Sequence, residues 1–168
     1  EKKEPWCKGA AAVCDIGVFT PEAIDPLERD ASLGLEGVTR MLEESAQQFD
    51  ILDYDSDFSQ YKVIILPDDI SINEVLAEKL KAFTDAGGAL IASFASGMNE
   101  AQDAFVLPQL GVSLTEGDAP EMRGVVTERG DYCEYLQTEA LTGNGIVDTE
   151  YVMYIKGMPV KADADTEV

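Results

Sequence analysis

The sequence has no histidine among its 168 residues. Ser-His-Asp and Cys-His catalysis both need an imidazole that takes up and returns a proton near neutral pH. Catalytic zinc sites also commonly use His ligands, so zinc-dependent hydrolysis is disfavoured as well. Any chemistry in this chain therefore has to use carboxylates, Lys or Tyr, or residues that another domain supplies.

Basic residues are scarce, because 12 Lys and Arg stand against 33 Asp and Glu and the net charge is −21. Nucleic-acid binding needs cationic side chains that displace counterions from phosphates, and anionic membranes attract basic segments for a similar reason. No apolar run approaches the roughly 18 residues of a membrane span. We therefore expect neither a nucleic-acid nor a membrane partner. The acidic excess favours solubility, and affinity for cations is the alternative.

The chain has only three cysteines, Cys7, Cys14 and Cys133. Their odd number and their spacing match no zinc pattern and favour thiols, although a Cys7–Cys14 bridge stays open.

The charged start "EKKEPWCKG" has no secretory signal pattern. The compartment is left open: the cytoplasm is slightly favoured, and a secreted or periplasmic location would need a signal upstream.

Two motifs that resemble ligand sites are incomplete. Asp53, Asp55 and Asp57 imitate the opening of a calcium loop, but Phe58 stands where the loop needs Gly and Ile64 where it needs Glu. The pair Gly87-Gly88 lies between a predicted helix and a predicted strand, which is the wrong order for a phosphate-binding loop. We expect no metal and no cofactor.

The hydrophobic pattern predicts an α/β fold with a doubly wound parallel sheet. Apolar runs predict strands, and residues at a spacing of 3.6 predict helices, with Ser71 and Glu74 as a capping box before the second helix and Gly87-Gly88 as its stop. The expected strands are residues 10–19, 49–53, 63–66 and 89–94, and the expected helices lie in residues 34–49 and 70–88.

After Gly97 the pattern changes to a short helix followed by strands. Turn residues at 129–130, 142–145 and 157 separate antiparallel strands, which predicts a C-terminal antiparallel β addition. Trp6 and four tyrosines of this part could stack on sugars, although such rings more often fill a core or an interface. These tyrosines are Tyr132, Tyr135, Tyr151 and Tyr154.

Carboxylates near strand ends are the candidate substrate-binding residues. Asp68 and Asp69 follow the third strand. Asp15 lies inside the first strand, and we expect it to be near the carboxyl end of that strand. Ligands of open α/β sheets bind at these ends, so the three could converge, although Asp68 or Asp69 could instead cap the next helix. An acid within an apolar strand must also be hydrogen-bonded or titrate abnormally. Ser96 and Asn99, after the fourth strand, complete the set.

The stretch "GGALIASFASG" has the pattern of a strand that ends in a nucleophile turn. The nucleophile position falls on Ala95 or Ser96. Ala95 carries no reactive atom, and Ser96 has no histidine partner in the chain. The alternative is a tight turn whose serine caps the next helix. We therefore expect no catalytic residue here, and Ala95 marks a degenerate nucleophile position.

Five segments in order, "AVCDIGVF", "GLEGVTRMLEES", "YKVIILPDD", "LAEKLKAFTDAGGALIASFASG" and "LPQLGVSL", resemble the middle domain of family 42 β-galactosidases and of fucosidase-like glycoside hydrolases. The resemblance covers roughly residues 9–160 and implies a flavodoxin-like, glutamine-amidotransferase-like fold. Active members of that superfamily carry a Cys, one further residue and a Gly at the turn. Aligned on Gly97, this Cys position is Ala95, so the hydrolytic machinery is absent.

The resemblance implies a non-catalytic accessory domain that assembles a trimer and can line a sugar site beside a barrel domain that carries catalysis. Residues 1–8 would be the linker from that upstream domain, residues 9–160 the domain, and residues 161–168 the start of a downstream connection. The partners would be the other domains of the parent glycoside hydrolase, further copies of it, and a carbohydrate. The alternatives are a flavodoxin-like hydrolase that uses carboxylates and a small-ligand or sugar-binding module.

Overall fold

The computed structural model describes residues 3–20, 33–115, 124–126, 132–136, 151–153 and 160–167. The chain divides into two compact units, one made of Glu1–Ser113 with Ala162–Val168 and the other of Leu114–Lys161. The larger part of the described elements lies in the first unit: α1 (Glu4–Cys7), β1 (Ile16–Phe19), α2 (Leu33–Glu44), β2 (Phe49–Leu52), η2 (Phe58–Gln60), β3 (Val63–Leu66), α3 (Glu74–Asp85), β4 (Ala89–Ala92) and η3 (Pro108–Leu110).

Four strands of the first unit form a parallel sheet in the order β2-β1-β3-β4. β6 (Gly124–Val126), β7 (Tyr132–Leu136) and β8 (Tyr151–Met153) form a separate antiparallel sheet, and β5 (Val112–Leu114) pairs with β9 (Val160–Ala162). These sheets confirm the predicted α/β class with a parallel sheet and a separate antiparallel part. The predicted turns at residues 129–130, 142–145 and 157, and Tyr154, lie outside the described residues.

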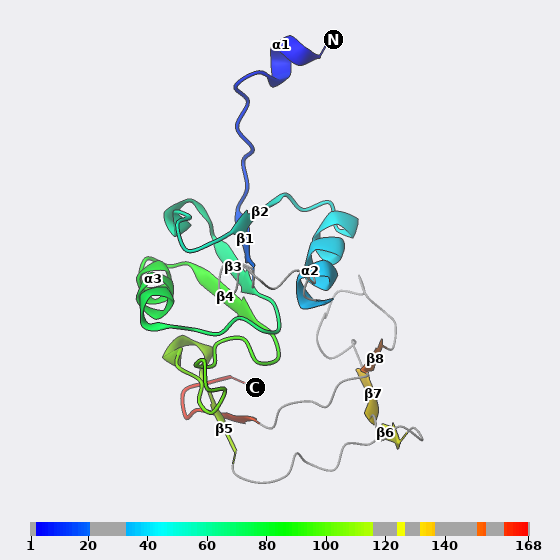
Figure 1. Cartoon of the computed structure of the whole chain (residues 1–168), viewed down its shortest axis with the longest axis vertical. Coiled ribbons are helices and arrows are strands. Elements are labelled where there is room, and N and C mark those ends of the chain that lie inside the picture. The colour runs from blue at the N-terminus through cyan, green and yellow to red at the C-terminus, as the bar shows by residue number, and fades with distance from the viewer. Residues whose placement is uncertain are drawn as a thin grey trace. The chain divides into compact units, whose positions relative to one another are not determined.

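Helices lie on both sides of the parallel sheet, with α2 and α3 opposite each other (Figure 1). The main core lies on the α3 side of the sheet. Side chains alternate between the two faces of a strand, so every second strand residue points into this core. The buried side chains of this core include Phe19, Leu52, Ile64 and Leu66 from the sheet and Leu76, Leu80 and Phe83 from α3.

The ends of α3 show which capping predictions hold. The Asn73 side chain accepts a hydrogen bond from the Leu76 N–H at 2.9 Å, so Asn73 is the N-cap and the predicted Ser71 cap is wrong. The helix starts later than predicted, and Asn is as good a cap as Ser. At the other end Gly87 has φ +95°, and Gly87 and Gly88 donate to the carbonyls of Thr84 and Phe83. This Schellman pattern confirms the predicted stop.

The first strand is shorter than predicted, since β1 contains only the last four residues of the apolar run 10–19. Ile16 pairs with the first residue of both neighbours, Phe49 of β2 and Val63 of β3. Residues before Ile16 therefore have no strand beside them, and the Val13 side chain is 83% exposed.

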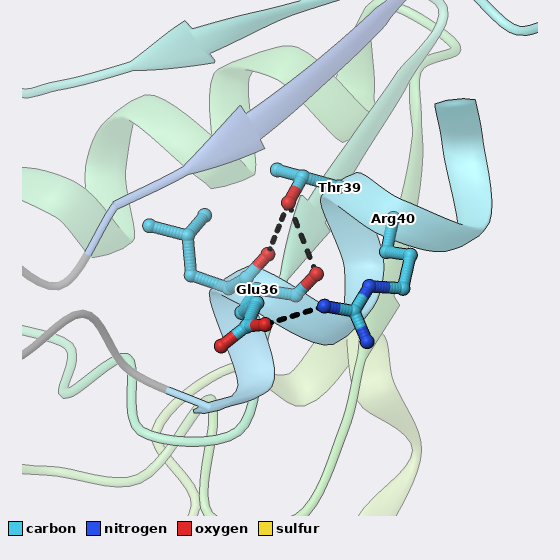
Figure 2. A network of polar contacts seen from close by, with 4 residues as sticks. Glu36, Thr39 and Arg40 are labelled. Carbon is cyan, nitrogen blue, oxygen red and sulfur yellow. Dashed lines mark hydrogen bonds and ion pairs between the residues drawn. The ribbon is translucent and has the colours of Figure 1, made fainter. Parts of the chain in front are cut away.

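The helix predicted over residues 34–49 ends at Glu44. Ala46 takes a left-handed φ of 55° and Phe49 opens β2, so neither lies on the predicted helical face. No residue of α2 is fully buried. Its polar face is held locally, since the Thr39 hydroxyl contacts the Leu35 and Glu36 carbonyls and Arg40 pairs with Glu36 at 2.7 Å (Figure 2).

The short helix predicted after Gly97 is reduced to η3, one 3-10 helical turn at Pro108–Leu110, and residues 98–105 are not helical. Met98 and Phe105 form an isolated antiparallel bridge there, closed by the Asn99 N–H, which donates to the Ala104 carbonyl at 2.9 Å. This hydrogen bond and the one that the Val106 N–H donates to the Gly97 carbonyl at 2.9 Å use backbone groups that a helix would need.

Replacing Leu80 with Ala should lower the free energy of unfolding by about 2–5 kcal/mol, because its fully buried side chain would leave a cavity in the α3 core. Urea unfolding followed by circular dichroism measures the loss. Val75→Ala on the same helix is the matched control, since Val75 is 61% exposed and its loss should stay below about 1 kcal/mol. Equal losses for the two variants would contradict this core.

Candidate functional site

The carboxyl ends of β1, β3 and β4 meet at one edge of the parallel sheet, which we call the carboxyl edge. It comprises Thr20 after β1, residues 67–70 after β3 and the turn at residues 93–97 after β4. Ligands of open α/β sheets bind at this kind of edge, so it is the candidate functional site.

Ser93 and Asp68 join the two loops of the carboxyl edge. The Ser93 hydroxyl donates to Asp68 Oδ1 at 2.7 Å and accepts from the Asp68 backbone N–H at 3.0 Å. The Ser93 N–H donates to the Leu66 carbonyl at 3.2 Å. Ser93 was not among the residues selected from the sequence; a hydroxyl near the carboxyl end of one predicted strand, beside the strand that leads into Asp68, is the signal that could have found it.

Ser96 lies in the same turn as Ser93 and is buried, with 1% of its surface exposed. Its hydroxyl accepts a hydrogen bond from the Ile70 N–H at 3.0 Å, and the Gly97 N–H donates to the Ile70 carbonyl at 3.1 Å. Ser96 therefore caps the backbone of the loop after β3, not the following helix that the alternative prediction gave it. The hydroxyl stabilises the turn and does not face solvent.

The tip of the turn is Phe94, which has a left-handed φ of 48° and a side chain that is 45% exposed. A nucleophile turn holds its reactive residue in such a strained, exposed position. Ala95, the position that alignment on Gly97 assigns to the nucleophile, is 6% exposed. Backbone geometry thus matches Phe94 better than Ala95, and neither side chain carries a nucleophilic atom.

Asp68 and Asp69 lie at the carboxyl edge as expected. A Cβ atom on Gly34 would lie 2.7 Å from the Asp68 carboxyl carbon, so this carboxylate sits against the first turn of α2. The partial positive charge at a helix start stabilises an anion there. Asp69 is exposed, although neighbouring atoms shield part of its carboxyl from water. This desolvation is the larger cause that raises the pKa of the carboxyl, and the neighbouring Asp68 charge is the second.

Asp15 lies at the opposite edge, so the prediction that it stands near the carboxyl end of β1 is wrong. It directly precedes Ile16, and its carboxylate pairs with Lys62 Nζ at 2.8 Å. Its backbone carbonyl accepts from the N–H groups of Lys62 and Val63. Asp15 therefore does not converge with Asp68 and Asp69, because the strand that was expected to begin at Ala10 begins after it.

Asn99 lies beside a surface groove at the start of α3. Its amide donates to Asp103 Oδ1 at 2.7 Å and its side-chain oxygen accepts from the Asp103 N–H at 3.1 Å. The groove is lined by Ile72, Asn73, Glu74, Ala77, Asn99, Glu100, Ala101 and Val106. Asn99 is thus fixed in orientation at a concave, mixed polar and apolar surface.

The carboxylates of Asp53 and Asp57, in the stretch that resembles a calcium loop, accept hydrogen bonds from backbone N–H groups. Asp53 accepts from Ser56 and Asp55, which lowers the pKa of its carboxyl, and Asp57 caps η2 through the Ser59 N–H. Among the described residues no three His, Cys, Asp or Glu are grouped to hold a metal ion, and no helix is long and apolar enough to cross a membrane. Cys7 and Cys14 are both free thiols, so the bridge left open by the sequence is not formed.

Ser96→Ala should cost about 1–3 kcal/mol of unfolding free energy, because the buried Ile70 N–H would lose its acceptor. Ser93→Ala is the comparison in the same turn; it should cost less, since the exposed Asp68 groups can bond to water. Urea unfolding of both variants gives the two values. A neutral Ser96→Ala variant would show that this bond does not hold the turn.

Asp69→Asn should stabilise the fold at neutral pH. A carboxyl whose pKa is raised on folding binds more protons in the native state, so wild-type stability falls as pH rises from the unfolded pKa through the raised one. The variant lacks this penalty, so its advantage should shrink to nothing below the ordinary Asp pKa of about 3.9. Urea unfolding at several pH values tests it, and an advantage that is constant with pH would refute the assignment.

Comparison with known proteins identifies relatives of the chain. The family model of the beta-galactosidase trimerisation domain matches residues 40–159. Beta-galactosidase Pbg of Clostridium perfringens is 25% identical, over 66% of this chain and 19% of that protein. Among solved structures, alpha-L-fucosidase isoenzyme 2 of Paenibacillus thiaminolyticus has a TM-score of 0.71 at 32% identity and covers 98% of this chain.

A third relative, Gan42B, a GH42 beta-galactosidase of G. stearothermophilus, has a TM-score of 0.66 at 19% identity, over 98% of this chain, which shows a shared fold. The chain spans 24% of each of these two solved chains. The similarity thus concerns one part of longer proteins. Since the family model matches well over half of the residues, the chain belongs to the beta-galactosidase trimerisation domain family.

Proposed function

We propose that this chain is a non-catalytic accessory domain of a glycoside hydrolase and that it assembles the parent protein into a trimer. The observation that carries the proposal is the turn after β4, where Ser93 and Ser96 are used in hydrogen bonds and Phe94 occupies the tip. Membership of a trimerisation family supplies the assembly role.

We further propose a flavodoxin-like, glutamine-amidotransferase-like fold. The strand order β2-β1-β3-β4 matches the first four positions of the flavodoxin-like order 2-1-3-4-5. In this proposal residues 1–8 link an upstream domain, residues 9–160 form the domain, and residues 161–168 begin a downstream connection.

The carboxyl edge is the surface that we propose to line a sugar site of a neighbouring barrel domain. Phe94 offers an exposed ring and Asp69 an exposed carboxylate, and Asn99 is held rigidly beside the α3 groove. An aromatic face combined with planar polar groups suits a polyhydroxylated ligand, since the ring covers apolar C–H surface and the polar groups bind hydroxyls.

Sedimentation equilibrium of the full-length polypeptide tests the assembly role. The proposal expects a mass of three subunits, because a trimerisation domain should bring three copies together. A monomer at all concentrations up to about 100 µM would contradict it, since a stable interface gives a Kd well below that.

The non-catalytic role has a separate test in the same protein. The double variant Asp68→Asn with Asp69→Asn should leave kcat on aryl β-galactoside and aryl α-fucoside substrates within about twofold of the unmodified protein, because we assign chemistry to another domain. A role of Asp69 in lining the sugar site would change KM and not kcat. A catalytic carboxylate here would lower kcat by about 100-fold or more, which would overturn the proposal.

A further inference from the structure

β4 forms one edge of the described parallel sheet. The Ala89 N–H donates to the Lys62 carbonyl at 2.9 Å and the Ser93 N–H to the Leu66 carbonyl at 3.2 Å, so these groups point toward β3. Because N–H directions alternate along a strand, the N–H groups of Leu90 and Ala92 point away from β3. This row of backbone groups is the free edge of β4.

The free edge lacks the features that protect exposed strands. Edge strands are commonly guarded by charges, proline or bulges. Residues 89–94 read ALIASF and contain none of these, in a chain whose net charge is −21. The opposite edge strand, β2, carries Asp50 and is followed by Asp53.

The side chains of β4 match an interior strand. Leu90 and Ala92 pack against the core on the α3 side. Ile91 points to the opposite face, where 53% of its surface is exposed, and the exposed Phe94 follows at the carboxyl edge. Apolar residues on both faces are typical of parallel strands that are covered on both sides.

We propose that a further β-strand of the parent polypeptide pairs with the free edge of β4 and that this segment covers Ile91. The inference rests on the flavodoxin-like order proposed above, in which a fifth strand follows the fourth in the sheet. The solved relatives are long enough to supply it, since this chain spans 24% of each. A second copy fits less well, because two β4 edges that pair about a twofold axis close a dimer, not a trimer.

Hydrogen–deuterium exchange on the full-length polypeptide, resolved to single amides by mass spectrometry, tests the pairing. The Leu90 and Ala92 amides should exchange at least roughly 100-fold more slowly than unstructured amides, as slowly as the Ile91 amide that faces β3. Rapid exchange at Leu90 and Ala92 beside a slow Ile91 would overturn the proposal. Protection that disappears on dilution to single subunits would also overturn it, because the occupant would then be a second copy.

The dilution series separates this inference from the trimer. Protection at β4 in a protein that sediments as a monomer would support the inference while contradicting the proposed assembly role. Rapid exchange at Leu90 and Ala92 in a stable trimer would contradict the inference while supporting the proposed assembly role.

A matched pair of variants gives a second readout in the full-length protein. Ile91→Asp should lower the melting temperature of the domain by roughly 4–8 °C, because it would place a charge under the added segment. Val75→Asp, at a side chain that is 61% exposed on α3, should change it by about 1 °C or less. Similar small shifts for both variants would show that Ile91 stays exposed and would contradict the proposal.

Discussion

The hydrogen bonds between the turn after β4 and the loop after β3 are the constraint on which the site depends. The Ile70 N–H donates to the Ser96 hydroxyl and the Ile70 carbonyl accepts from the Gly97 N–H, so one turn satisfies both backbone groups of Ile70. At the exposed surface the Ser93 hydroxyl accepts from the Asp68 N–H and donates to the Asp68 carboxylate. With these groups committed to the backbone, the edge keeps the outline of a catalytic turn while its hydroxyls serve the fold.

The two faces of the parallel sheet are stabilised unequally. On one face Leu76, Leu80 and Phe83 of α3 complete a continuous core. On the other face α2 buries no residue completely, and the isoleucines of both edge strands, Ile51 and Ile91, remain half exposed. Burial of apolar area is the main favourable term in folding, so the second face is where an additional segment would add most stability.

Sequence patterns predicted the elements whose limits are set locally. Val63–Leu66 was predicted to the residue, because an apolar run ends at Pro67, and the Gly87-Gly88 stop follows from the left-handed conformation that glycine favours. The start of β1 was missed because it depends on where β2 and β3 begin, which is a property of register. Ala10 to Cys14 are apolar enough for a strand, but they have no neighbour to pair with.

The candidate site was predictable to a similar degree. The carboxyl-edge position of Asp68 and Asp69 followed from the strand before them, whereas Asp15 was misplaced together with the start of β1. Ser93 escaped notice because its role exists only once two loops distant in sequence lie side by side. The Asn73 cap was missed since Ser71 and Asn73 have equal preference for that position, and only the packing of α3 decides between them.

We propose that the chain contributes assembly, and not chemistry, to a larger glycoside hydrolase. A structure of the intact polypeptide in solution, determined by electron cryo-microscopy, tests this most directly. We expect three subunits around one axis, with this domain in contact with a neighbouring subunit and the catalytic carboxylates in another domain. A domain that contacts no other subunit, or catalytic carboxylates that belong to Asp68 and Asp69, would contradict it.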